Sequence, residues 1–266
     1  MSSAETYQLY AIRFAERTGR RAEMFLGGDP RDEPMGMDYF VWVAVSDRRA
    51  VVIDTGFTAE EAARRGRAHL RNPVEVLLRL GVEPSEVRDV VLTHLHYDHV
   101  GYQRSFPNAR VHLQERELHF AVGRDMQHPA LGRAMTIEDV VDLVRDSYAG
   151  RIAFHDGDAE VAPGLSVHFL GGHTAGLQVV RVETQRGAVV IGSDASHYYE
   201  NFEAGRPFAV IYNVSDTLRG FDRMRELAAL PQHIIPGHDP LVMRRYPAAS
   251  AELERVVVRL DVEPMS

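Results

Sequence analysis

Short apolar runs, separated by turns rich in Gly, Pro and polar residues, recur along the chain from residue 7 to residue 235. Runs of about four to eight apolar or alternating residues between such turns predict β-strands. The segment Gln185-Arg186-Gly187 between two such runs indicates a hairpin. We expect strands over residues 7–14, 39–45, 50–54, 90–93, 110–113, 151–155, 165–170, 178–183, 188–193 and 234–235.

Helical patterns alternate with these strands. Thr58 followed by Glu61 is a capping-box signature and predicts a helix over residues 58–70. Asn72-Pro73 begins another predicted helix, which Gly81 and Pro84 end. Further helices are expected over 115–122, 136–148 and 215–230, the last two opened by Thr136 and Ser215, with irregular structure over 123–135.

The order of these elements predicts the organisation of the chain. Strands come in two runs, each mixed with helices, which favours a layered α/β domain with two sheets packed on each other. We expect a single domain over residues 1–266, with a helical insertion around 115–150. The link from Leu26 to Met37 is dense in Gly and Pro, so we expect a loop long enough to reach over a site.

Composition narrows the classes of function. The 266 residues include 30 Lys and Arg against 38 Asp and Glu, for a formal net charge of -8. This charge repels phosphate backbones and anionic lipid headgroups, so nucleic acid and membranes are disfavoured partners. The N-terminal residues lack a basic segment followed by an apolar one, and no apolar run approaches the roughly 18 residues of a membrane span. We therefore expect a cytoplasmic protein.

The sequence contains no cysteine, which excludes disulfides, thiolate catalysis and cysteine-based zinc sites. Any metal must be held by His, Asp or Glu, and His94, His96, Asp98 and His99 directly follow an apolar strand. Side chains two residues apart at a strand end point to the same side, so His94 and His96 can share one ion. Asp98 and His99 lie beyond the strand and can face a second ion. The spacing therefore favours two adjacent metals over a histidine-rich surface loop.

If these residues bind metals, further ligands are expected where other strands end. His173 follows the strand that ends at 170, Asp194 follows the strand that ends at 193, and His238 follows the one that ends at 235. Asp54 also ends a strand. We expect it to accept a hydrogen bond from a metal-binding histidine, with a turn-forming role as the alternative.

These motifs resemble those of the metallo-β-lactamase superfamily. Its His-x-His-x-Asp-His motif is matched in full at residues 94–99, and the Asp-Thr-Gly turn at 54–56 and the Gly-His loops at 172 and 237 extend the resemblance over nearly the whole chain. The resemblance implies an αββα four-layer sandwich with a dinuclear metal site at one edge. It also implies two divalent ions, with zinc expected: His94, His96 and His173 would bind one ion, Asp98, His99 and His238 the other, and Asp194 would bridge them.

Residues 193–208 are similar to a segment of the N-acyl-homoserine lactonases within this superfamily. Those lactonases place a tyrosine directly after Asp-Ala-Ser, where this chain has His197. We expect His197 to donate a hydrogen bond to a substrate oxygen and Asp98 to orient or move a proton; simple packing of His197 beside the metals is the alternative. Tyr198, Met35 and Met37 are the other expected substrate contacts, with a core role equally open for the two methionines.

The resemblance implies a metallohydrolase that opens a lactone ring, on an N-acyl-homoserine lactone or a related lactone, by attack of a metal-bridging hydroxide. A thioester hydrolase resembling glyoxalase II is the alternative within enzymes, but no clear basic cluster follows the metal motifs. The acidic charge disfavours a phosphodiesterase. A non-catalytic binding module on the same fold should have lost ligand positions, and none is missing. The expected partner is a small-molecule lactone, and a homodimer stays open.

Overall fold

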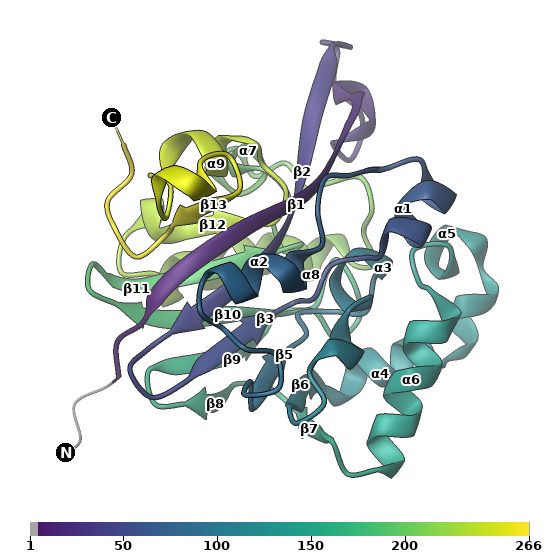
Figure 1. The fold of residues 1–266 in the computed structure, drawn as a ribbon. Coiled ribbons are helices and arrows are strands. Elements are labelled where there is room, and N and C mark those ends of the chain that lie inside the picture. Colours follow the sequence, from purple (N-terminus) through teal and green to yellow (C-terminus); the bar gives the residue numbers. More distant parts are fainter. Residues whose placement is uncertain (1–4, 266) are drawn as a thin grey trace.

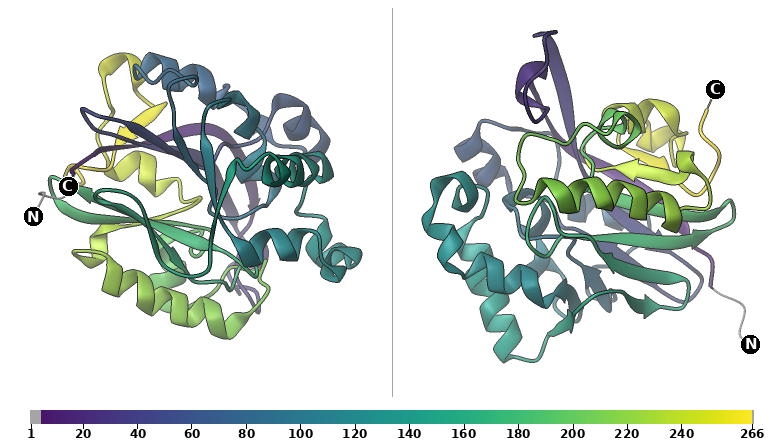
Figure 2. Two further views of the ribbon diagram at one scale, coloured as in Figure 1. Left: turned by 90° about the horizontal axis from the view of Figure 1, so that it is seen from below. Right: turned by 180° about the vertical axis from the view of Figure 1, so that it is seen from behind.

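The computed structural model describes residues 5–265, in which two β-sheets pack face to face (Figure 1). Helices cover the outer faces of both sheets (Figure 2), so the predicted αββα sandwich is confirmed. The first sheet contains β1 (Gln8–Arg20), β2 (Pro34–Val45), β3 (Ala50–Ile53), β4 (Ala68–His69), β5 (Asp89–Val91), β6 (Arg110–Gln114), β7 (Ile152–His155) and β13 (Val257–Arg259). The second contains β8 (Ala159–Ala162), β9 (Leu165–Phe169), β10 (Gln178–Thr184), β11 (Gly187–Ser193) and β12 (Ile234–Pro236).

The longest helix, α8 (Val214–Leu227), lies across the outer face of the second sheet (Figure 2). Its buried residues Phe221, Met224 and Leu227 are spaced three apart, as on one face of a helix, and they pack into the core on that side of the sheet. The remaining helices are α1 (Ala59–Arg65), α2 (Pro73–Arg79), α3 (Tyr97–Val100), α4 (Glu115–Ala121), α5 (Pro129–Gly132), α6 (Ile137–Tyr148), α7 (Tyr199–Ala204) and α9 (Leu241–Arg245), with short 3-10 turns at 21–23, 103–105, 124–127, 231–233 and 251–253.

Strand β2 shows why the first sheet is apolar on both faces. Along residues 39–44, alternate side chains pack toward the helices and toward the second sheet, and all of them are buried. A strand covered on both sides reads as a continuous apolar run. Trp42, fully buried between the sheets, is the largest of these side chains.

Parallel pairing brings the functional strand ends to one edge. β3 pairs in parallel with β5, and β11 pairs in parallel with β12. Their carboxyl ends carry Asp54, Thr93, Asp194 and His238. Gly237 permits this approach, because a Cβ there would lie 2.7 Å from the Ser193 backbone. The edge therefore collects residues that are far apart in sequence.

The loop expected from Leu26 to Met37 ends earlier than predicted, at residue 33, and the strand expected to end at residue 14 is longer than predicted. β1 continues to Arg20 and β2 begins at Pro34, and these two residues face each other in the antiparallel register. Continued pairing satisfies the backbone groups, and proline is tolerated at the first residue of a strand. The resulting hairpin rises above the rest of the molecule in Figure 1.

Two predicted helices end earlier than expected. The helix capped by Thr58, whose hydroxyl accepts from the Glu61 amide as predicted, stops before Gly66, which has a left-handed φ of 65°. The helix predicted to begin at Ser215 is capped by Asn213 instead and ends at Leu227. Asn213 lies two residues before the predicted cap Ser215, both residue types are good helix N-caps, and the sequence alone does not decide between them.

The segment from 123 to 135, expected to be irregular, contains a 3-10 turn and α5. Thr136 does not cap α6 with its side chain, because its hydroxyl donates to Glu61.

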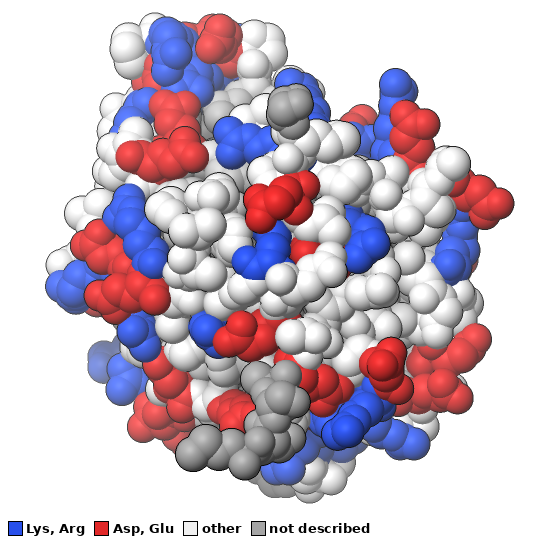
Figure 3. Space-filling view, turned by 90° about the vertical axis from the view of Figure 1, so that its left-hand side faces the viewer, with Lys and Arg blue, Asp and Glu red and all other residues white. Residues whose placement is uncertain are grey.

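No helix within residues 5–265 combines the length and the hydrophobicity that a membrane crossing needs. The N-terminal prediction concerning a leader falls partly on residues 1–4, outside the described range. On the face shown in Figure 3, acidic and basic side chains are interspersed.

Candidate active site

The side chains predicted to bind metals lie together at the edge where the strands end. All are buried, at 8% exposure or less. Three groups of donor atoms have the spacing of an ion site, with the donors of each group within 4.8 Å of one another. The first group is His94, His96, His173 and Asp194, and the second is Asp98, His99 and His238. The third group, Asp194, His197 and His238, shares two residues with the other groups and adds His197.

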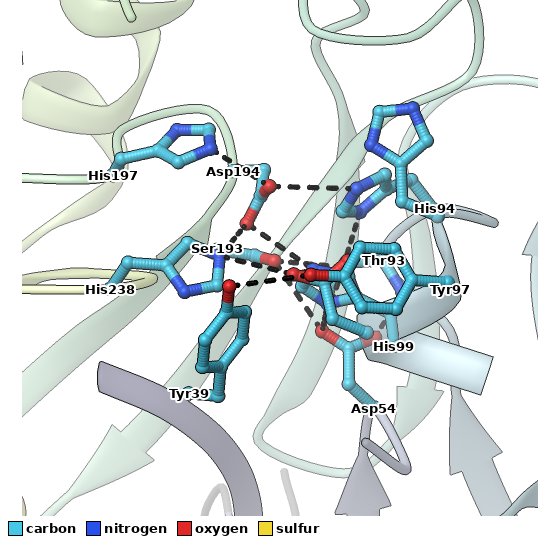
Figure 4. A network of polar contacts seen from close by, with 12 residues as sticks. Tyr39, Asp54, Thr93, His94, Tyr97, His99, Ser193, Asp194, His197 and His238 are labelled. Atoms are coloured by element: carbon cyan, nitrogen blue, oxygen red, sulfur yellow. Dashed lines mark hydrogen bonds and ion pairs between the residues drawn. The ribbon is translucent and has the colours of Figure 1, made fainter. Parts of the chain in front are cut away.

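Asp194 lies between the two groups (Figure 4). Its Oδ2 is 3.1 Å from Nε2 of His173 and 3.7 Å from Nε2 of His94. Its Oδ1 is 2.9 Å from Nε2 of His238 and 3.4 Å from Nε2 of His99. The two oxygens of one carboxylate therefore face different histidine groups.

Hydrogen bonds fix the orientation of the histidine rings. Nδ1 of His173 donates to the carbonyl of Val210, and Nδ1 of His238 donates to the carbonyl of Asp38, each at 2.8 Å. A proton on Nδ1 leaves the lone pair on Nε2. Both Nε2 atoms point into the cluster, as ligand atoms must.

Asp54 organises the part of the cluster next to β5. Its Oδ2 accepts from Nδ1 of His99 at 2.7 Å, and its Oδ1 accepts from the amide of Thr93 at 2.7 Å. The Thr93 hydroxyl donates to Asp54 and lies 3.2 Å from Nδ1 of His94, which can donate to it. One carboxylate thus orients two histidines, directly and through a threonine.

Three ring nitrogens of the cluster have no hydrogen-bond partner among residues 5–265. Nε2 of His94, Nε2 of His99 and Nδ1 of His197 are all buried. A buried polar atom without a partner is costly, so such atoms call for a ligand. A set of imidazole nitrogens and carboxylate oxygens suits divalent cations such as zinc. The residues present therefore fit a metal centre.

The protonation of the cluster differs between the two groups. Burial lowers the pKa of His94 and of His96 well below the usual value, which favours the neutral ring that binds metals. Burial also acts to lower the pKa of His99, but nearby carboxylates, Asp54 foremost, outweigh it and raise that pKa well above its usual value. Burial alone would raise the pKa of Asp194, yet the surrounding histidines, His197 first, lower it well below its usual range. The centre is therefore built to hold positive charge.

His197 lies inside the cluster. Its Nε2 is 3.1 Å from Oδ2 of Asp194, and its ring stacks on Phe208 with a centroid separation of 3.6 Å. Burial lowers the pKa of His197 to about 3, against the opposing effect of Asp194, so the ring is neutral. A neutral ring with a proton on Nε2 donates that proton to Asp194.

A cavity of about 110 Å³ opens beside these residues. Of the predicted substrate contacts, His197 and Met37 line it. The other two predicted substrate contacts, Tyr198 and Met35, are not among the described residues that line the cavity. The Tyr198 hydroxyl donates to the carbonyl of Gly36, and the Met35 sulfur lies near Arg21. The other lining residues are Arg17, Tyr39, Arg67, His96, Tyr97, Asp98, Ala134, His173, Asp194, Phe208, Val210 and His238.

Some of these residues escaped the sequence analysis. Arg17 lies on the part of β1 beyond the predicted strand end, and Arg67 lies where a helix was predicted. Tyr39 sits in an apolar strand that looks purely structural. Tyr97 lies inside the histidine motif at residues 94–99, and this position was the one sequence feature that could have indicated its place in the cavity.

Glu117 on α4 was also missed, and it connects two loops of the cluster. Its carboxylate is fully buried and accepts from the amide of Leu95 at 3.0 Å and from the amide of Gly176 at 2.8 Å. Leu95 lies between His94 and His96, and Gly176 follows the loop of His173. Glu117 therefore holds together the two segments that carry the three histidines of the first donor group.

The chain belongs to the metallo-β-lactamase superfamily, whose profile matches residues 35–256. It is similar to an N-acyl homoserine lactonase of Bacillus thuringiensis, with 32% identity over 168 residues, which are 62% of this chain and 61% of the relative. It is also similar to the N-acyl homoserine lactonase AttM of Azorhizobium caulinodans, with 29% identity over 174 residues, 60% of this chain and 61% of that one. The matched part thus spans about 61% of the length of these curated relatives. The crystal structure of a quorum-quenching N-acyl homoserine lactone lactonase has the same fold, with a TM-score of 0.74 at 23% identity over 91% of this chain and 95% of that chain.

Proposed function

We propose that this chain is a metal-dependent hydrolase that opens the ring of a lactone, with N-acyl-homoserine lactones as the first substrates to test. The observation that carries the proposal is the position of Asp194, whose two oxygens face two separate histidine groups. The names of the curated relatives support lactones as the substrate class.

The proposed cofactors are two divalent metal ions, with zinc expected. The two donor groups and the unpartnered Nε2 atoms of His94 and His99 support this assignment. When bound, such ions would supply an activated hydroxide between them and polarise the lactone carbonyl. In this assignment His94, His96 and His173 hold one ion, Asp98, His99 and His238 hold the other, and Asp194 bridges them.

Ring opening has a definite proton balance. The carbonyl carbon gains the hydroxide oxygen and becomes a carboxylate, while the bond to the ring oxygen breaks and that oxygen leaves as an alcohol. The leaving oxygen must therefore receive the proton that the added hydroxide gives up. Asp98 lines the cavity, and its Oδ2 lies 3.7 Å from Nε2 of His99 and of His238. We assign to Asp98 the orientation and transfer of that proton.

His197 was expected to assist at a substrate oxygen. Its ring lines the cavity, but its Nε2 proton is directed at Asp194. The observed contact supports a role in positioning the bridging carboxylate. A direct bond to substrate requires that this proton change partner, so replacement of His197 separates the two roles.

The test is a panel of lactones, thioesters and phosphodiesters assayed with metal-reconstituted protein. Turnover of lactones with about two metal equivalents per chain is expected. Activity confined to thioesters or phosphodiesters would contradict the proposal. Binding of metals without turnover of any ester would instead favour a non-catalytic module.

Four further expectations stay proposals. A single domain with an insertion at 115–150 is supported by helices α4 to α6, which fall in that span. The absence of nucleic-acid and membrane partners is supported by the net charge of -8, and a cytoplasmic location stays an expectation. A homodimer is the fourth, and its measurement is the mass in solution.

A further inference from the structure

Two arginines line the cavity beside the metal-binding side chains. Arg17 comes from β1, and Arg67 comes from the short link between α1 and β4. Both side chains are half-buried, and both share the cavity wall with Asp98 and His197. The sequence showed no basic cluster after the metal motifs; the fold supplies one from residues that precede them.

The charge of Arg17 has no carboxylate partner. Its Nε lies 3.3 Å from the sulfur of Met37, and its Nη2 lies 3.8 Å from the sulfur of Met24. A thioether is a weak acceptor, whereas a guanidinium has five N–H donors. Within residues 5–265 no carboxylate oxygen lies within 4.0 Å of this group. Most of its hydrogen-bonding capacity is unused.

Arg67 is held against the cavity wall by neutral groups. Its Nε donates to the Tyr97 hydroxyl at 3.1 Å, and its Nη1 donates to the carbonyl of Arg65 at 2.9 Å. Tyr97 in turn contacts the hydroxyl of Tyr39 at 3.3 Å. In the described part of the chain this guanidinium also lacks a carboxylate within 4.0 Å. The contacts fix its position, and Asp98, whose charge acts on it across the cavity, makes no ion pair with it.

Two cations without an ion-pair partner beside a proposed metal centre make the cavity strongly positive, and an anionic ligand would lower that charge. The planar fork of a guanidinium matches a carboxylate. The cavity of about 110 Å³ is also small compared with the roughly 300–1,000 Å³ of pockets for larger ligands. We propose, on the basis of the lactonase function above, that the substrate is a compact lactone whose non-reacting part carries a carboxylate bound by Arg17 and Arg67.

The experiment compares γ-butyrolactone bearing a γ-carboxylate with its primary amide, on the metal-reconstituted full chain. The two lactones share the ring and differ in charge. The carboxylate is expected to have a kcat/KM at least about tenfold higher, the size of effect that charge-assisted hydrogen bonds produce. In Arg17→Gln and Arg67→Gln this preference should fall toward one, mainly through KM. The matched control is Arg48→Gln, an exposed arginine outside the cavity, which should keep the preference.

Equal use of the amide and the carboxylate, or a preference that both arginine variants retain, overturns the inference. Failure of every lactone while two metals are bound strikes the proposed function instead. In that case calorimetric binding of the ring-opened hydroxy diacid to the metal-loaded protein still decides the role of the arginines. Binding that weakens about tenfold in both variants supports the anion site, and unchanged binding rejects it. Thermal unfolding and metal content establish that the variants are folded.

Discussion

Asp54 accepts a hydrogen bond from His99, with 2.7 Å between Oδ2 and Nδ1 and both side chains buried. The aspartate sits at the end of β3 with a left-handed φ of 57°, a conformation that Asp and Asn tolerate better than most residues. The bond directs Nε2 of His99 toward Asp194, at 3.4 Å from Oδ1. Asp54, which is outside the proposed ligand set, therefore orients the ring of His99, which belongs to that set.

Replacement of Asp54 by Asn tests this relationship without straining the backbone. The amide keeps the size and the left-handed conformation but loses the charge that holds the His99 ring. We expect the affinity for one of the two metal ions to fall about 10–100-fold. Competition with a chromophoric chelator measures it. Asp47→Asn, the same change at an exposed position, is the control. Equal affinities in both variants would remove the role of Asp54.

Several residues placed in the candidate site from sequence carry a simple local signal. They are polar residues within two positions of the end of an apolar strand, as at Asp54, Asp194 and His238. Parallel pairing of β3 with β5 and of β11 with β12 then brings these strand ends to one edge. Local pattern and topology act together here, so sequence reasoning reached the cluster.

The residues that sequence reasoning missed depend on contacts between distant segments. Glu117 reads as an ordinary first-turn helix acid, and only the fold buries it between the Leu95 and Gly176 amides. Arg17 reaches the cavity because β1 extends as far as Arg20, and that extension comes from pairing with a Gly- and Pro-containing segment that local propensity reads as a loop. Contacts between distant segments overrode the local signal in both cases.

Asp194→Asn should disable the proposed centre more than any single histidine change. The amide replaces one of the two carboxylate oxygens by an NH2 group, so one histidine group loses its shared oxygen, and loss of the charge leaves excess positive charge in a buried site. We expect kcat for the best lactone to fall at least about a hundredfold, with fewer than two metal equivalents retained. Elemental analysis of the reconstituted protein gives the metal count. Full occupancy with normal turnover would contradict the bridging role.

His197→Phe removes the ring nitrogens while it keeps the stack on Phe208. If the ring positions Asp194, kcat should fall about tenfold with little change in KM, because a single hydrogen bond to a charged group is lost. If it contacts the substrate instead, KM should rise as well. His197→Gln, which retains an N–H donor, should recover part of the loss. A pH profile that is unchanged in rate and shape for the Phe variant excludes both roles.

Glu117→Gln should loosen the first donor group. The glutamine amide presents N–H donors where the carboxylate accepted from the Leu95 and Gly176 amides, so at least one buried amide loses its partner. The expected loss is about 1–3 kcal/mol of unfolding free energy, together with weaker metal binding. Urea unfolding with and without metal measures both. Glu115→Gln, an exposed change on the same helix, is the control. Identical stability in the two variants would show that the buried contacts contribute nothing.

Asp139 predicts a pH dependence of stability that lies outside the metal cluster. Burial, together with Glu61 and other nearby carboxylates, raises its pKa from 3.8 to about 6 in the folded protein. The folded state therefore holds this proton more tightly than the unfolded state. The free energy of unfolding should fall as the pH rises from about 4 to about 6, and the penalty should be complete above that range.

Asp139→Asn cannot ionise, so it should be more stable than the parent at pH above about 7 and equal to it near pH 4. The gain should be about 1–2 kcal/mol, below the roughly 3 kcal/mol of the full pKa difference, because the side chain is partly exposed and the first turn of a helix favours a carboxylate. Urea unfolding across this pH range measures the difference. Asp222→Asn, at a side chain 76% exposed, should leave the pH dependence in place. A gain for Asp139→Asn that persists at pH 4 would mean that the effect comes from packing and not from the charge.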